Sequence, residues 1–247
     1  MSEQPALPPL WQWPRVAGQA LHVRRQALRL PPAAGADRGH AKGGAGATLR
    51  LVMVGDSIAM GVGVARSEES LVAQTAAALS GLVGRDCEWQ RLGRSGAALA
   101  EIVSFAQSLE AAALDVIIVS AGVNDVTELT STRRWQRGLR SLDELVAQRW
   151  PGAWLIHLGL PPMHRFPLLP EPLRATLGWR AQRLDAALIR HCASPQRLHV
   201  AIEGPVDGAD FAADGYHPNA TATARWAARL AGRIAPLLQA SRPGQAP

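Results

Sequence analysis

Ser57 stands directly after the apolar run 49–54, and further polar or glycine residues follow at intervals along the chain. A hydroxyl at the end of a predicted strand projects from the edge of a sheet, where a nucleophile can reach a substrate. Gly96, Asn124 and His217 also lie at predicted strand ends or in loops. A hydroxyl, an imidazole and amide donors are the groups that acyl transfer requires.

A serine hydroxyl is too weakly acidic to attack at neutral pH without a base. His217 could take the proton of Ser57 and later return it to a departing alkoxide. Asp214 stands three residues before His217 in the turn 214–218, so its carboxylate could fold back onto the imidazole and fix its tautomer. These three residues are the predicted catalytic set. A plain Asp-Gly turn that caps the last helix is the alternative for this segment.

The tetrahedral intermediate of acyl transfer carries an oxyanion, which needs hydrogen-bond donors. The backbone amides of Ser57 and Gly96 and the side-chain amide of Asn124 could supply three. Glycine at position 96 would let the backbone approach the substrate without a Cβ. Helix-like sequence from Ile58 onward would aim the amides of a first helical turn at the same anion. Gly96 and Asn124 could each also be simple turn residues.

Short apolar runs alternate with longer helical segments from residue 48 onward. This alternation predicts right-handed crossovers and a parallel sheet covered on both faces. Ligands of such sheets bind beyond the carboxyl ends of the strands, which is where the candidate residues fall. The expected strands are 49–54, 86–91, 115–120, 153–158 and 197–202, and the expected helices lie near 64–80, 97–112, 131–149, 171–191 and 219–239.

The composition fits one folded α/β domain. The 247 residues are 47% hydrophobic and 19% charged, far from the range of disordered chains. The formal charge of +6 comes almost entirely from arginines, since Lys42 is the only lysine. These arginines are dispersed through predicted helices without a nucleic-acid recognition motif, so we expect no nucleic-acid partner.

Cysteine usage and hydropathy indicate the compartment. Cys87 and Cys192 fit no metal-binding spacing and are too few for a disulfide framework, so we expect two free thiols. No apolar run reaches the length of a membrane span, and no signal-peptide pattern opens the chain. A cytoplasmic location is therefore the expectation.

Residues 1–47 differ from the rest of the chain because prolines interrupt them and Gly39 to Gly46 reads as a flexible linker. We expect an N-terminal extension over 1–47, one domain over 48–240 and a tail over 241–247. The extension could act as a weak membrane-surface anchor, or it could be an arm packed on the domain. The residues that suggest an anchor are the apolar Leu7, Leu10, Trp11, Trp13, Leu21, Val23, Leu28 and Leu30 between Arg15, Arg24, Arg25 and Arg29.

The set of motifs resembles the SGNH hydrolases, the GDSL-type esterase and lipase superfamily, over roughly residues 49–235. Gly-Asp-Ser at 55–57 looks like the first block of this family, Gly96 the second, Gly-Val-Asn-Asp at 122–125 the third, and Asp214 with His217 the fifth. The resemblance implies a flavodoxin-like three-layer α/β/α sandwich with a mostly five-stranded parallel sheet. It also implies a Ser-His-Asp triad, a Ser/Gly/Asn oxyanion hole and no metal or other cofactor.

Two departures from the family pattern concern the first two blocks. The first reads Gly-Asp-Ser-Ile instead of Gly-Asp-Ser-Leu, and isoleucine still supplies an aliphatic anchor. The second reads Leu-Gly-Arg-Ser-Gly-Ala over 92–97, so Gly93 could compete with Gly96 as donor. We prefer Gly96 because it directly precedes the predicted helix.

The expected activity is hydrolysis of short- to medium-chain carboxylic esters, with a small-molecule ester as the partner. The apolar, proline-stiffened segment 159–170 could wall an acyl pocket, and Asp56, Met163 and Phe166 are the predicted pocket residues. Transfer to, or deacetylation of, a sugar or lipid acceptor is the alternative, and a non-catalytic interaction module is a further one. A nucleotide site is disfavoured because Gly61-Val-Gly63 lacks the third glycine and the phosphate-binding lysine. The oligomeric state stays open.

Overall fold

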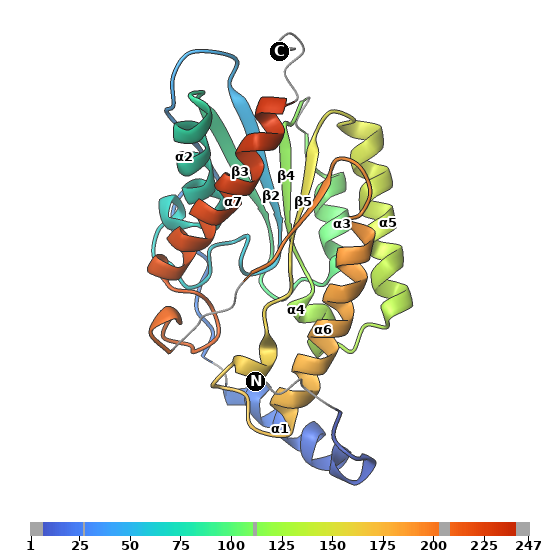
Figure 1. The fold of residues 1–247 in the computed structure, drawn as a ribbon. Helices are drawn as coiled ribbons and strands as arrows, with labels where there is room; N and C mark the ends of the chain where they lie inside the picture. The colour runs from blue at the N-terminus through green and yellow to red at the C-terminus, as the bar shows by residue number, and fades with distance from the viewer. Residues whose placement is uncertain (1–6, 27, 111–112, 203–207, 241–247) are drawn as a thin grey trace.

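The protein is described by a computed structural model over residues 7–26, 28–110, 113–202 and 208–240 (Figure 1). The expected tail 241–247 and the start of the expected extension lie outside these residues. The described chain forms one six-stranded sheet in the order β1-β3-β2-β4-β5-β6. The strands are β1 (Arg38–Ala41), β2 (Leu49–Gly55), β3 (Cys87–Gly93), β4 (Val116–Ser120), β5 (Trp154–Leu158) and β6 (Arg197–Val200).

Strands β2 to β6 are parallel, and they are the five strands that the sequence predicts. Strand β1 is an additional edge strand that pairs antiparallel with β3. It lies in the segment for which the sequence predicts a flexible linker. The sequence does not indicate this strand, because its exposed and half-buried residues do not alternate between apolar and polar. Gly39 belongs there for a steric reason, since a Cβ would lie 2.4 Å from the indole ring of Trp89.

Helices cover both faces of the sheet, which confirms the predicted three-layer sandwich (Figure 1). On β2, Leu51 and Met53 belong to the core with the helices α2 (Leu71–Val83) and α7 (Ala220–Ala240). Val52 and Val54 belong to the core with α3 (Leu99–Gln107) and α5 (Thr132–Arg149). Successive strand residues point to opposite faces, so the buried residues of one strand contribute to two separate cores.

The helices agree with the predicted ones to within a few residues at most ends. The α-helices are α1 (Trp13–Gln26), α2 (Leu71–Val83), α3 (Leu99–Gln107), α4 (Val123–Thr127), α5 (Thr132–Arg149), α6 (Leu173–His191) and α7 (Ala220–Ala240). Short 3₁₀ helices are η1 (Leu10–Gln12), η2 (Ser67–Glu69), η3 (Met163–Arg165) and η4 (Gly208–Asp210). Helices α1 and α4 are additional to the prediction.

Helix α1 packs against the start of α6, as expected for an arm on the domain surface. Val16 is buried there, and the Gln19 side chain bonds the backbone at both Glu171 and Leu173. None of the described helices combines the length and the apolar character needed to cross a bilayer.

Candidate active site

Ser57 lies just beyond the end of β2, in a run of tight turns over residues 56–63. The helix expected from Ile58 is absent, and α2 begins only at Leu71. Gly61 and Gly63 adopt φ angles of +70° and +104°, which a right-handed helix does not contain. No helix N-terminus therefore supports an oxyanion at Ser57.

Asp214 and His217 form a compact turn that holds the imidazole from one side. Gly215 has φ +64°, and Asp214 Oδ1 accepts hydrogen bonds of 3.0 Å from the amides of both Tyr216 and His217. Asp214 Oδ2 lies 2.6 Å from His217 Nδ1. The carboxylate thus fixes the ring orientation and favours the tautomer with hydrogen on Nδ1.

The charge of Asp214 is set by opposing effects. Burial raises the pKa of its carboxyl, but the hydrogen bonds from the His217 amide and ring and from the Tyr216 amide outweigh burial. The resulting pKa lies below the usual 3.8, so Asp214 is ionised at neutral pH.

Ser57 and His217 meet although 160 residues separate them. His217 Nε2 lies 2.8 Å from Ser57 Oγ, within hydrogen-bonding reach. With Nδ1 donating to Asp214, Nε2 is free to accept the serine proton. The chain Ser57–His217–Asp214 has the connectivity of a nucleophile, a base and an orienting acid.

Gly63 explains how the two loops come so close. A Cβ at Gly63 would lie 2.3 Å from the Pro218 carbonyl oxygen and 3.0 Å from His217 Cβ. The turn after Ser57 and the segment with the histidine are therefore in direct backbone contact. This close packing accounts for the glycine at position 63, whereas a Cβ at Gly61 would lie 2.8 Å from Ala33 Cβ.

Gly96 and Asn124 are brought together at the start of α3. Ala97 N bonds the Arg94 carbonyl at 3.0 Å, and Gly96 occupies the third position of that turn with φ +86°. Asn124 Nδ2 donates to the Ala97 carbonyl at 2.9 Å. An amide group has two N–H donors, so this bond engages one and positions the other.

Gly93 is explained by strand packing. A Cβ there would lie 2.0 Å from the Gly55 carbonyl oxygen of the neighbouring strand. At Gly96, by contrast, no described atom lies within 4 Å of a Cβ position, and the positive φ is what requires glycine. The backbone thus requires glycine at both positions. Only Gly96 lies in the loop that Asn124 contacts.

Ser57 and His217 open onto a cavity of about 540 Å³, counting space open to solvent. Gly96 and Asn124 are not among its lining residues. Its walls come from β5, the loop after β5, the turn 214–218 that carries His217 (the histidine turn) and α7. These walls are mainly apolar. The lining comprises Asp56, Ser57, Ile58, Ser120, Ala121, Val123, Leu158, Gly159, Pro161, Phe166, Ile202, Tyr216, His217, Pro218 and Trp226.

The three predicted pocket residues have different positions. Asp56 and Phe166 line the cavity, and the Phe166 ring stacks edge-to-face on Tyr216 at 5.0 Å. Met163 is fully buried in the core with α6 and does not line the cavity. The expected contribution of Met163 is therefore not found, because η3 turns its side chain into the core.

Asp56 is a buried carboxyl beside the nucleophile. Its Oδ1 accepts a 2.7 Å hydrogen bond from Ser120 Oγ and a 3.1 Å bond from the Ile58 amide. Burial nevertheless raises the pKa of Asp56 to about 6, since the hydrogen bonds and nearby His217 only partly compensate. Ser120 is a site residue that sequence reasoning missed, although its place at the end of β4 follows the same strand-end rule.

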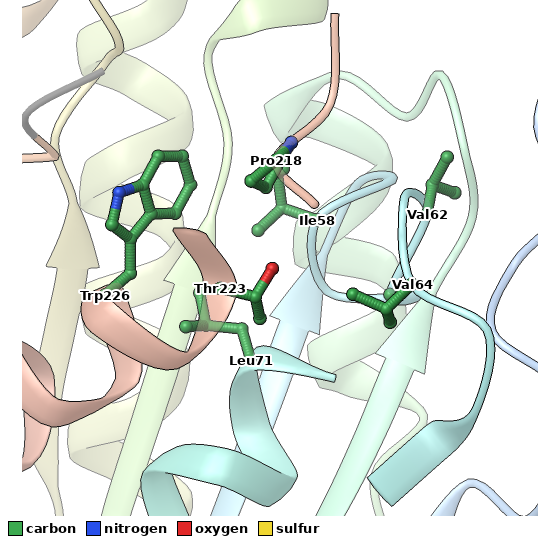
Figure 2. Close-up of a pocket in the computed structure, with 8 residues that line it drawn as sticks. Ile58, Val62, Val64, Leu71, Pro218, Thr223 and Trp226 are labelled. Atoms are coloured by element: carbon green, nitrogen blue, oxygen red, sulfur yellow. The ribbon is translucent and has the colours of Figure 1, made fainter. Parts of the chain in front are cut away.

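A smaller apolar pocket lies beside the first, on the other side of the turns after Ser57 (Figure 2). Ile58, Pro218 and Trp226 line both pockets. Trp226 projects from α7, whose amphipathic sequence predicts the helix but not this cavity-lining role.

Among the described residues, one group could offer metal ligands. Donor atoms of Asp143, His157 and His191 lie within 4.8 Å of one another. Arg197 Nε is 3.0 Å from Asp143 Oδ2, and this guanidinium offsets the charge that would attract a cation. Burial lowers the pKa of His157 to about 3, so this core histidine is neutral.

Comparisons with known proteins found one family match and several similar folds. A profile of the GDSL-like lipase/acylhydrolase family matches residues 53–225. A search of curated proteins found no match.

Three solved structures illustrate the shared fold. A carbohydrate esterase family 2 enzyme with its carbohydrate-binding domain, from Corynascus thermopiles (Myceliophthora fergusii), matches with a TM-score of 0.59 at 16% identity, covering 86% of this chain and 69% of that chain. Est24, a carbohydrate acetylesterase from Sinorhizobium meliloti, has a TM-score of 0.53 at 17% identity over 76% of this chain and 99% of its own. An extracellular lipase from Streptomyces rimosus has a TM-score of 0.54 at 18% identity over 78% and 100%.

These likenesses concern the fold, whereas the profile match spans most of the chain and includes the serine, asparagine and histidine segments. The chain belongs to the GDSL-like lipase/acylhydrolase family and is a carboxylic ester hydrolase.

Proposed function

We propose that the protein cleaves short- to medium-chain carboxylic esters through an acyl-enzyme formed on Ser57. The observation that carries this proposal is the continuous hydrogen-bonded path from Ser57 Oγ through His217 to Asp214, at 2.8 and 2.6 Å. Such a path is what a serine needs to become a nucleophile at neutral pH.

In the first step, Ser57 Oγ attacks the ester carbonyl carbon while its proton moves to His217 Nε2. Asp214 stabilises the imidazolium without taking the proton. Collapse of the tetrahedral intermediate breaks the bond to the alcohol oxygen, and Nε2 returns the proton to that alkoxide. Water then attacks the acyl-enzyme with the same histidine as base, releasing the acid and restoring the serine.

For the oxyanion we propose the amides of Ser57 and Gly96 and the side chain of Asn124. The bond from Asn124 to the Ala97 carbonyl supports this role, because it ties the side-chain donor to the Gly96 turn. A donor held in place before the reaction stabilises developing charge without reorganisation.

The cavity supports an acyl chain as the group bound beside Ser57. Leu158, Ile202, Phe166 and Trp226 supply apolar walls. Each methylene group buried against such walls contributes roughly 0.8 kcal/mol. Asp56 and Ser120 are polar lining residues beside Ser57, and Ser120 Oγ donates a hydrogen bond to Asp56 Oδ1.

A sugar ester, or transfer of the acyl group to a sugar or lipid alcohol, is the second candidate. Est24 shares the fold and is a carbohydrate acetylesterase. An acyl-enzyme can be resolved by water or by an alcohol, so both outcomes use the same residues. Comparing acetylated sugars with nitrophenyl butyrate, with and without added alcohol acceptors, separates these possibilities.

The two cysteines support a cytoplasmic location, which we propose on this basis. Cys87 and Cys192 are free thiols, and burial raises the pKa of each to about 12. Unpaired, unreactive thiols suit a reducing compartment.

Replacing the nucleophile tests the proposal directly. Ser57→Ala should abolish turnover of nitrophenyl acetate and butyrate while the circular dichroism spectrum and melting temperature stay close to those of the wild type. Ser104→Ala, on the exposed face of α3, is the matched control and should retain full activity. A folded Ser57→Ala protein with undiminished turnover would exclude the mechanism.

The triad should also behave as one unit. Asp214→Asn should lower kcat by roughly 10³- to 10⁴-fold, because the imidazole loses its orientation and charge partner. The double variant Ser57→Ala, Asp214→Asn should be no slower than Ser57→Ala alone. Losses that multiply would show that Asp214 acts independently of the serine.

A further inference from the structure

Exposed apolar side chains are concentrated at the N-terminus. Nine large hydrophobic residues of the described chain are exposed, and five of them fall between residues 7 and 28. Leu10 and Trp11 are the most exposed, at 84% and 77%. Single exposed leucines are ordinary, but a cluster that includes an open tryptophan marks an interaction surface.

One face of helix α1 packs on the domain, and the opposite face is exposed. Val16 is buried and Val23 half-buried against the core with α6, and Gln19 bonds the backbone that begins α6. These positions are three and four residues apart, so they share one face. Leu21 and Arg25 lie on the opposite side and are exposed.

The charge of this surface has one sign. Arg15, Arg24 and Arg25 are exposed on α1, and residues 7–36 contain no aspartate or glutamate. The apolar and basic residues together form what we call the N-terminal surface: Leu10, Trp11, Arg15, Leu21, Arg24 and Arg25.

The N-terminal surface lies at the same end of the molecule as the candidate active site. Figure 1 shows α1 below the carboxyl ends of the strands, next to η3 and the start of α6. Leu168, also exposed, follows η3 and lies beside the histidine turn, since a Cβ at Gly215 would be 3.9 Å from Leu168 Cβ. An object bound at α1 would thus lie near the mouth of the site.

We propose that the N-terminal surface docks on an anionic lipid surface. Arginines around an exposed tryptophan and leucines match a layer with negative headgroups above acyl chains. A second copy of this chain fits less well, because a two-fold contact would bring the arginines of α1 against the same arginines. Docking is independent of the proposed catalysis, although it would hold the cavity close to lipid esters.

Vesicle co-sedimentation with the full chain tests this docking. The wild type should bind vesicles of phosphatidylcholine and phosphatidylserine in equal amounts and bind phosphatidylcholine vesicles much less. Arg24→Gln with Arg25→Gln should weaken binding to the anionic vesicles about twenty-five-fold, since each basic residue near such a surface contributes roughly fivefold. Leu10→Ser with Trp11→Ser should weaken it about tenfold or more, because the apolar burial is lost.

Matched controls change the same residue types elsewhere. Arg133→Gln with Arg140→Gln on the exposed side of α5, and Leu82→Ser with Ile189→Ser on α2 and α6, should leave binding unchanged. Ser57→Ala should bind vesicles like the wild type, which separates docking from catalysis. Turnover of nitrophenyl butyrate in vesicle-free solution should be unchanged in all the N-terminal variants.

Three outcomes would overturn the proposal. The first is that the wild type does not bind anionic vesicles, and the second is that the control variants weaken binding as much as the N-terminal variants do. The third is that the wild type dimerises with rising concentration in light scattering, and that Leu10→Ser with Trp11→Ser abolishes this dimerisation but still binds vesicles. The last result would assign the N-terminal surface to a second copy of the chain.

Discussion

Arg91 Nη1 donates a 2.9 Å hydrogen bond to the carbonyl of Met60, three residues beyond Ser57. The same buried guanidinium bonds the Ala33 carbonyl at 2.8 Å and the Asp37 carboxylate at 2.8 Å. Arg91 thus ties the turns after the nucleophile to residues 33–37 of the N-terminal extension. That part of the extension is structurally integrated with the site.

Arg91→Met should therefore loosen the nucleophile turns. It leaves the buried Ala33 carbonyl and the part-buried Met60 carbonyl without a charged donor, which costs roughly 2 to 4 kcal/mol in the free energy of unfolding. We expect a lower midpoint in urea denaturation and a lower kcat with a smaller change in KM. Arg50→Met removes only an exposed pair with Glu88 and serves as the control. Equal stability of the two variants would contradict this role.

Asn124→Ala should lower kcat by roughly 10²- to 10³-fold and leave KM nearly unchanged, because an oxyanion donor acts mainly in the transition state. Asn124→Asp, which keeps the shape but lacks the donor, should show a similar loss. Thr127→Ala changes an exposed residue on the same helix and should be neutral. A loss confined to KM would instead assign Asn124 to ground-state binding.

Ile202→Phe should shorten the preferred acyl chain, since the added ring fills the cavity beside Ser57. We expect kcat/KM to fall more steeply for nitrophenyl hexanoate than for nitrophenyl acetate. Ile189→Phe, at an exposed position of α6, controls for the added ring itself. An unchanged chain-length profile in folded Ile202→Phe would place the acyl chain outside this cavity.

Asp56 should make stability depend on pH. Its folded pKa of about 6 exceeds the reference value of 3.8, so the folded state binds the proton more tightly. Protonated Asp56 therefore stabilises the folded state. This stabilisation is complete below about pH 3.8 and is lost as the pH rises through about 6. Asp56→Asn removes this titration, so its stability relative to the wild type should rise by about 2 kcal/mol between about pH 4 and pH 7.

Urea denaturation of both proteins across this range measures the difference, and the titrations of groups that do not interact with Asp56 cancel. Asp214 does not interfere, because its pKa lies below the window. A pH-independent difference between the wild type and Asp56→Asn would mean that Asp56 titrates alike in the folded and unfolded states.

The features that were predictable from sequence rest on local patterns. The runs at β2 and β4 are mostly apolar, Arg50 and Ser120 being the exceptions, so they identify buried parallel strands. Strand β1 was not predictable, because its four residues become a strand only through pairing with β3. The missing helix at Ile58 shows the limit of composition, since two positive-φ glycines keep that segment in turns.

The sequence by itself determined which chemistry is available: a serine, a histidine, an aspartate and an asparagine, each beside a glycine-containing turn at a strand end or in a loop. Tertiary structure alone decided that Ser57 Oγ and His217 Nε2 lie 2.8 Å apart, that Phe166 faces the cavity and that Met163 does not. The reason is physical. Residue type and local spacing restrict the backbone within a few positions, whereas contacts across 160 residues depend on how the sheet and its helices pack.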